Sequence, residues 1–153
     1  MADKGDNSRK ALIEHLNRTL ADHFALYFKT KSYHWHVKGP QFRDLHLLFD
    51  EQATAIFGVT DVIAERVRKL DAGTLTSVGA IAEHSTIKDD DRTDIDAKSM
   101  IKALGDDNAA LVDGLKALKE VADEAGDNAT SALVDEWQDA AEERVWFLRQ
   151  SLR

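Results

Sequence analysis

Residues 33–42 read Tyr-His-Trp-His-Val-Lys-Gly-Pro-Gln-Phe, and they join two long stretches of the chain. Apolar side chains recur every three or four residues on both sides, which is the pattern of amphipathic helices. Gly is favoured just after a helix, and Pro is favoured in the first turn of the next one. Gly39-Pro40 therefore predicts a tight turn between two antiparallel helices.

Outward from this turn, the same spacing predicts four long helices over residues 8–36, 40–70, 96–122 and 130–152. Gly73 is expected to end the second of them. The connection between the second and third contains a short apolar piece, which predicts one short helix. Four long helices with a long middle connection favour an all-α, ferritin-like four-helix bundle.

Length and composition limit the remaining possibilities. The 153 residues favour a single domain over residues 1–153, with residues 1–7 as a short flexible tail. The absence of Cys excludes disulfides, thiolate metal sites and cysteine nucleophiles. No apolar stretch reaches the ~18 residues of a membrane span, and no secretory signal is visible, so we expect a cytoplasmic protein without a membrane partner. The net charge of −8 favours cations over nucleic acid as partners.

Two pairs of potential metal ligands lie on the second predicted helix. His46 with Asp50, and Asp61 with Glu65, are each four residues apart and so share a face. At about 100° per residue, all four fall on one face that is distinct from the apolar stripe. The pairs are ~22 Å apart along the axis, so they cannot bind the same ion within one helix.

A second copy of the chain resolves this distance. If the same helix of a partner packs antiparallel, the first pair of one chain meets the second pair of the other. Small residues cluster at the midpoint and permit close approach: Ala53, Ala55 and Gly58. Phe57 lies on the same face, where an exposed aromatic side chain indicates that a partner packs against it. The spacing therefore predicts two equivalent sites in a symmetric dimer.

His34 precedes the Gly39-Pro40 turn by about as much as His46 follows it, so the hairpin brings the two level. One chain then offers two imidazoles and the Asp50 carboxylate, a set suited to Fe(II). The partner would add Asp61 and Glu65, which suffice for a second or bridged metal.

Simpler interpretations exist for each residue. His46 and Asp50 form a plausible surface ion pair, and Glu65 can pair with Lys69. Asp61 beside Glu65 is harder to explain, because like charges at this spacing cost ~0.2–0.5 kcal/mol without a cation between them. Taken as a set on one face away from the core, the residues favour metal.

Other polar residues carry weaker signals. His36 lies about 200° around a helix from His34 and is left out of the ligand set. Residues 89–91, three consecutive Asp, are interpreted as a solvated loop. The remaining histidines are interpreted as surface or partly buried residues: His15, His23 and His84.

The sequence closely resembles the Dps family of miniferritins. The resemblance rests on residues 33–42, 45–46, 49–50 and 61–66, and it extends to residues 146–148. It implies a hollow dodecamer with ferroxidase sites at dimer interfaces, which consume hydrogen peroxide and store ferric mineral. The family's iron ligands fall on His34, His46, Asp50, Asp61 and Glu65. His36 is a departure, since many relatives carry Asn there, and Trp35 matches a residue that lies close to the iron.

The expected function is therefore iron storage and detoxification by a ferroxidase, with DNA protected from oxidative damage. The alternative is a nucleoid protein that contacts and condenses DNA. Residues 1–10 carry Lys4, Arg9 and Lys10 against two Asp, a small positive excess. We accordingly expect DNA binding to be weak, salt-sensitive or absent. A third possibility is a structural helical assembly with a vestigial site. Candidates for an iron entry route are Asp123, Asp127 and Asp135.

Overall fold

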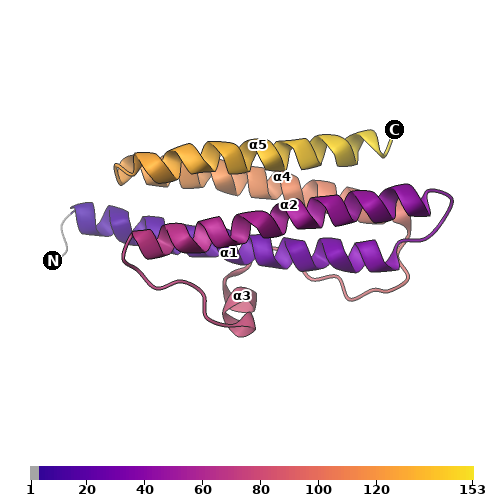
Figure 1. Ribbon diagram of the computed structural model, residues 1–153, viewed down its shortest axis with the longest axis horizontal. Helices are drawn as coiled ribbons and strands as arrows, with labels where there is room; N and C mark the ends of the chain where they lie inside the picture. The colour runs from indigo at the N-terminus through magenta and orange to yellow at the C-terminus, as the bar shows by residue number, and fades with distance from the viewer. Residues whose placement is uncertain (1–3) are drawn as a thin grey trace.

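The computed structural model describes residues 4–153, which contain only helices and loops. Four long helices and one short helix follow one another along the chain (Figure 1): α1 Lys4–His36, α2 Phe42–Lys69, α3 Val78–His84, α4 Ala97–Glu124 and α5 Asn128–Gln150. The predicted all-α four-helix bundle, with a short helix in the long connection, is confirmed. None of the helices in this described part of the chain is long and apolar enough to cross a membrane.

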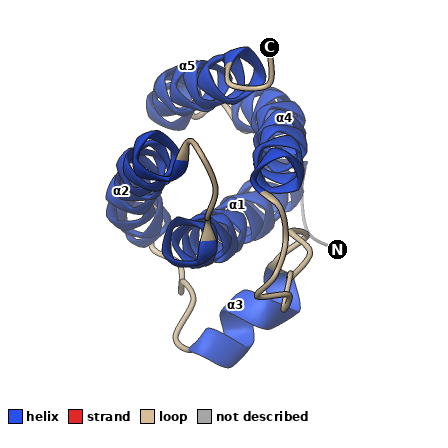
Figure 2. Cartoon of the chain, turned by 90° about the vertical axis from the view of Figure 1, so that its right-hand side faces the viewer, coloured by secondary structure: helices blue, strands red, loops and turns tan. Residues whose placement is uncertain are grey.

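The helices form two antiparallel hairpins that pack into one bundle. α1 lies along α2 and α4 lies along α5, while contacts of α1 with α4 and of α2 with α5 close the bundle. Figure 2 shows the four long helices around a common centre, with α3 outside them against α1. The connection through α3 runs from one end of the bundle to the other, so α2 and α4 point the same way (Figure 1).

Backbone conformations with positive φ occur at the turns. Gly39 has φ 118° between α1 and α2, and Gly126 has φ 70° between α4 and α5, as their positions in the sequence predict. The end of α2 differs from the prediction. Asp71, with φ 61°, takes the left-handed position there, and Gly73 lies beyond it. Asp tolerates this conformation better than most residues, so no glycine is required.

The start of α1 also differs from the prediction. Residues 4–7, expected as part of a flexible tail, are the first turn of the helix, and residues 1–3 lie outside the described residues. Asp6 lies in this first turn, where a negative charge interacts favourably with the helix dipole. The helix therefore begins four residues earlier than the apolar pattern indicates, because that pattern reports burial rather than helicity.

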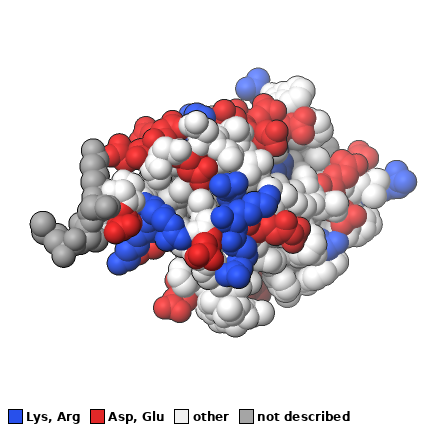
Figure 3. Space-filling view, turned by 60° about the vertical axis from the view of Figure 1, so that its left-hand side comes forward, with Lys and Arg blue, Asp and Glu red and all other residues white. Residues whose placement is uncertain are grey.

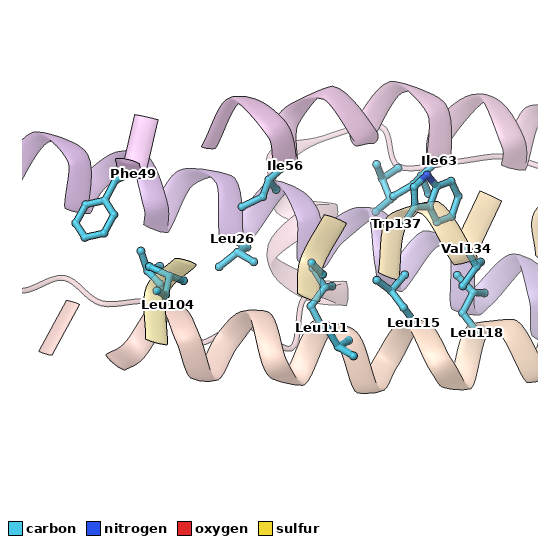
Figure 4. Packing of buried hydrophobic residues seen from close by; sticks show 14 of the residues in the cluster. Leu26, Phe49, Ile56, Ile63, Leu104, Leu111, Leu115, Leu118, Val134 and Trp137 are labelled. Carbon is cyan, nitrogen blue, oxygen red and sulfur yellow. The ribbon is translucent and has the colours of Figure 1, made fainter. Parts of the chain in front are cut away.

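The core runs the length of the bundle between the four long helices (Figure 4). The predicted apolar stripe of α2 is confirmed through its middle, where Phe49, Ile56 and Ile63 are fully buried. Phe42 has the same helical spacing as these residues but is 45% exposed. It occupies the first position of α2, next to the turn, where no neighbouring helix covers it.

Polar side chains tie the long connection to α1. The buried Asp22 carboxylate accepts hydrogen bonds from Thr86 N at 2.6 Å and from the hydroxyls of Ser85 and Thr86. The Tyr33 hydroxyl donates to Asp90 Oδ2 at 2.6 Å. Interpreting residues 89–91 as wholly solvated was therefore wrong for Asp90, which the sequence alone could not pair with a tyrosine on another helix.

Candidate metal centre

The two histidines flanking the first turn lie side by side. The imidazole rings of His34 on α1 and His46 on α2 are stacked, with centroids 3.8 Å apart and planes inclined by 17°. Each Nδ1 contacts the main-chain carbonyl of the other residue, at 2.6 Å for His34 and 2.7 Å for His46. The hairpin thus brings the two residues level, as the sequence predicts.

These reciprocal contacts decide which nitrogen of each ring carries hydrogen. A carbonyl oxygen only accepts, so each Nδ1 must be the donor. In a neutral imidazole the other nitrogen, Nε2, then carries a lone pair. Metal-binding histidines are commonly oriented by such a hydrogen bond from the nitrogen that does not bind the ion. Both rings are therefore prepared to bind a cation through Nε2.

Asp50 lies one turn after His46 and is held by a lysine. The Lys31 ammonium is 2.7 Å from Asp50 Oδ1, and His34 Nε2 is 3.8 Å from the same oxygen. The hydrogen bond and positive charge of Lys31 lower the pKa of Asp50, so the carboxylate is charged at neutral pH. The alternative of a His46–Asp50 surface pair is not observed. Lys31 was missed in the sequence analysis, although its position three residues before His34 places it on the same face.

Asp61 and Glu65 lie farther along α2, and both are exposed. Within residues 4–153 neither forms an ion pair, so the proposed Glu65–Lys69 pair is not seen. No group of three or more His, Asp or Glu residues in this part of the chain is arranged to hold a metal ion. The structure places His34 beside His46 and near Asp50, although not in an arrangement that would hold a metal within one chain, and it leaves Asp61 and Glu65 apart from them.

The middle of α2 has exposed residues between these two groups. A side-chain carbon added at Gly58 would meet no atom of this chain within 4 Å. Phe57 beside it is 51% exposed and leans on Tyr27, with ring centroids 4.9 Å apart. Ala55 is exposed as expected, whereas Ala53 is fully buried and belongs to the core. Only part of the predicted small-residue cluster therefore faces outward.

Large apolar side chains are unusually exposed around this face. They are contributed by α1, α2 and α3: Phe28, Trp35, Phe42, Leu47, Phe57, Val62 and Val78. Exposed apolar groups on this scale mark surfaces that another molecule covers. Trp35 is 56% exposed and packs edge-on against Phe28, with centroids 6.0 Å apart.

Other residues considered from sequence have local partners. The His36 Nδ1 contacts the Ser32 carbonyl at 2.7 Å. Of the candidate entry residues, Asp127 caps α5 through Thr130 N at 3.1 Å, and Asp135 pairs with Lys119 at 2.9 Å. The interpretation of His23 as a surface or partly buried residue was wrong, since it is fully buried. Its position cannot be recognised from an apolar stripe, because a histidine does not add to that pattern.

A four-helix bundle with imidazole and carboxylate pairs on an apolar face defines a ferritin-like helical protein. The ferritin-like domain model matches residues 13–153. The DNA protection during starvation protein of Brevibacillus brevis is 36% identical over 90% of this chain and 91% of its own length. The crystal structure of a Dps protein from Bacillus brevis superposes with a TM-score of 0.93, at 33% identity and full coverage of both chains.

A third relative connects the fold with iron. The Dps protein of Vibrio cholerae O1, described as a member of a broad superfamily of ferritin-like diiron-carboxylate proteins, has a TM-score of 0.90 and 31% identity. The match covers 96% of this chain and 92% of that one. The chain belongs to the Dps family of ferritin-like proteins.

Proposed function

We propose that this protein is a ferroxidase that oxidises Fe(II) with hydrogen peroxide and stores the ferric product. The sites lie between two copies of the chain related by a two-fold axis. His34, His46 and Asp50 of one protomer face the Asp61 and Glu65 positions of its partner. Iron is the substrate and the stored cargo.

The observation that carries this proposal is the stacked histidine pair. Its two Nε2 atoms are the ligand atoms left over when both Nδ1 atoms bond to main-chain carbonyls. Two imidazoles and one carboxylate, with further positions open, suit Fe(II). The exposed Asp61 and Glu65, which form no ion pair within residues 4–153, supply the second half from the partner. Membership of a ferritin-like family supports iron as the metal.

The proposed chemistry balances two iron ions against one peroxide. Each Fe(II) gives one electron, the O–O bond of hydrogen peroxide breaks, and two protons are taken up to form two waters. Bringing two irons together supplies both electrons at once, so no hydroxyl radical is released. The carboxylates of both protomers balance the extra positive charge of the ferric product.

Storage requires an assembly larger than the dimer. We infer a hollow dodecamer of these bundles in the cytoplasm, with the ferric mineral inside. The relative from Brevibacillus brevis is named for DNA protection. In this protein, such protection would follow from the removal of peroxide and free Fe(II) rather than from contact with DNA.

The test is anaerobic loading with Fe(II), followed by hydrogen peroxide and size-exclusion chromatography. Ferric absorbance should elute with a particle of about a dozen chains. The double variant His46→Ala/Asp50→Ala should lose rapid peroxide-dependent oxidation, while Asp44→Asn, an exposed carboxylate on the same helix, should retain it. Unchanged rates in the double variant, or iron precipitated outside the protein, would overturn the proposal.

A further inference from the structure

The centre of the bundle contains a polar cluster with one residue from each long helix. His23, Gln52, Asn108 and Arg144 come from α1, α2, α4 and α5, and all four are buried. Direct hydrogen bonds link three of them. Arg144 Nε donates to Asn108 Oδ1 at 2.7 Å, and Gln52 Nε2 donates to the Arg144 carbonyl at 3.3 Å. His23 is fully buried, and its Nδ1 donates to the Thr19 carbonyl at 2.8 Å.

Three atoms of this cluster have no hydrogen-bond partner within the described chain: Arg144 Nη2, Gln52 Oε1 and His23 Nε2. Buried polar atoms are rarely left unpaired, because each then loses its bonds to water without replacement. Three such atoms on buried side chains of this cluster call for a ligand.

The positive charge of Arg144 makes the need for a hydrogen-bonding ligand greater. Burial lowers the pKa of Arg144 to about 10, which leaves the guanidinium charged at neutral pH. No carboxylate within residues 4–153 forms an ion pair with it, and Glu143, whose charge reaches it, is exposed on the surface. A buried cation without a counterion is costly unless its remaining N–H groups are satisfied.

The unpaired atoms indicate what kind of ligand fits. Arg144 Nη2 is a donor. Gln52 Oε1 is an acceptor, and His23 Nε2 is also an acceptor, because its Nδ1 donates to the Thr19 carbonyl at 2.8 Å. Water accepts from the first atom and donates to the other two. An anion would satisfy only Arg144 and would face the lone pairs of the two acceptors.

There is room for such a molecule beside two of the three atoms. Gln52 and Arg144 line a small surface pocket of about 90 Å³ between α2 and α5. One water molecule needs a space of only ~10–15 Å³. The exposed Phe147 and the carboxylates of Glu51 and Glu143 also line this pocket.

We propose that the polar cluster is a binding site for buried water, which joins Arg144 Nη2 to Gln52 Oε1 and to His23 Nε2. The site is independent of the function proposed above, and it needs no partner subunit.

The experiment is an atomic-resolution crystal structure of the metal-free protein at pH 7, with bromide in the crystallisation solution. We expect solvent density without an anomalous signal, within about 2.7–3.2 Å of Arg144 Nη2 and Gln52 Oε1, and a water on His23 Nε2. An anomalous bromide peak at Arg144, or no density at these atoms, would overturn the proposal.

A variant separates a built site from solvent trapped by chance. Gln52→Leu should remove the water bound to Oε1, while Gln138→Leu, whose side chain bonds to Glu142 on the outside of α5, should leave it in place. Water retained at the same position in Gln52→Leu would contradict the role given to Gln52. The wild-type structure decides the proposal even if that variant does not fold.

Discussion

The Lys31 ammonium lies 2.7 Å from Asp50 Oδ1, an oxygen of one carboxylate in the proposed iron site. The lysine comes from α1 and the aspartate from α2, so the contact spans the first hairpin of the bundle. A metal that binds Asp50 must displace the ammonium or share the carboxylate with it. Lys31 is thus an internal competitor for the proposed iron site.

Replacing this lysine should tighten metal binding. In Lys31→Met, the initial affinity for Fe(II) in an anaerobic calorimetric titration should rise by up to about fivefold, because a partly exposed ion pair of ~0.2–1 kcal/mol no longer has to be broken. Lys116→Met, an exposed lysine on α4, serves as the control. Weaker binding in Lys31→Met would show that the lysine supports the site instead.

The pH dependence of the free energy of unfolding should reveal the lowered pKa of His23. Burial lowers the pKa of His23 from 6.5 to about 4, with the charge of Arg144 acting in the same direction. The unfolded chain therefore binds a proton between these pH values that the folded chain does not. The resulting stability is fully present above pH 6.5 and is lost as the pH falls to about 4, by about 3 kcal/mol in total.

Urea denaturation of metal-free protein at pH 7 and pH 4.5, at one protein concentration, measures this loss. His23→Leu should lose markedly less stability than the wild type over this interval. Some dependence should remain, since burial also lowers the pKa of His15. His84→Leu, an exposed histidine on α3, should behave like the wild type. Equal losses in His23→Leu and the wild type would contradict the assignment.

The open space over Gly58 makes a direct test of the two-fold interface. The Cβ that Gly58→Leu adds meets no atom of the chain within 4 Å, and the substitution replaces a residue that costs about 1 kcal/mol in a helix interior. Helical content should therefore be kept, while sedimentation velocity should show smaller species. Gly114→Leu on α4, which is equally free of neighbours, is the matched control. An intact assembly in Gly58→Leu would place the partner elsewhere.

The hydrogen bond from Tyr33 to Asp90 should contribute measurably to stability. Burial and this bond raise the pKa of Tyr33 far above its usual value, so the hydroxyl remains a donor at all ordinary pH values. Tyr33→Phe should lower the free energy of unfolding by ~1.5–3 kcal/mol in urea titrations, as for a bond to a charged group. Tyr27→Phe is the control, because that ring packs on Phe57 without a comparable bond.

Direct DNA binding should be weak. Figure 3 shows two groups of Lys and Arg side chains on one face of the molecule, with Asp and Glu between and beside them. Arg9 and Arg68 also donate to main-chain carbonyls at the end of α2, those of Leu70 and Ala72. In gel shifts, we expect binding at low salt only, since phosphate contacts weaken steeply as salt rises. Tight binding at physiological salt would favour the nucleoid alternative.

Much of the fold was determined by the sequence because the decisive signals are local. The Gly39-Pro40 turn and the apolar spacing of α2 follow from backbone sterics and helical periodicity, which act over a few residues. The face shared by His46, Asp50, Asp61 and Glu65 follows from the same periodicity. Belonging to the Dps family could likewise be inferred from residues 33–42 and 61–66.

Contacts between helices were decided only by the tertiary structure. The Nδ1 bond that orients His34 and the Lys31–Asp50 pair join two helices that the turn brings side by side, but which atoms meet depends on how the side chains pack. The Tyr33–Asp90 bond joins segments that no local spacing relates. The burial of His23 was also decided only by the tertiary structure. An apolar pattern in the sequence identifies the apolar residues of the core and does not identify polar residues buried among them. Local periodicity fixes which face a residue occupies, whereas its partner depends on how the helices pack.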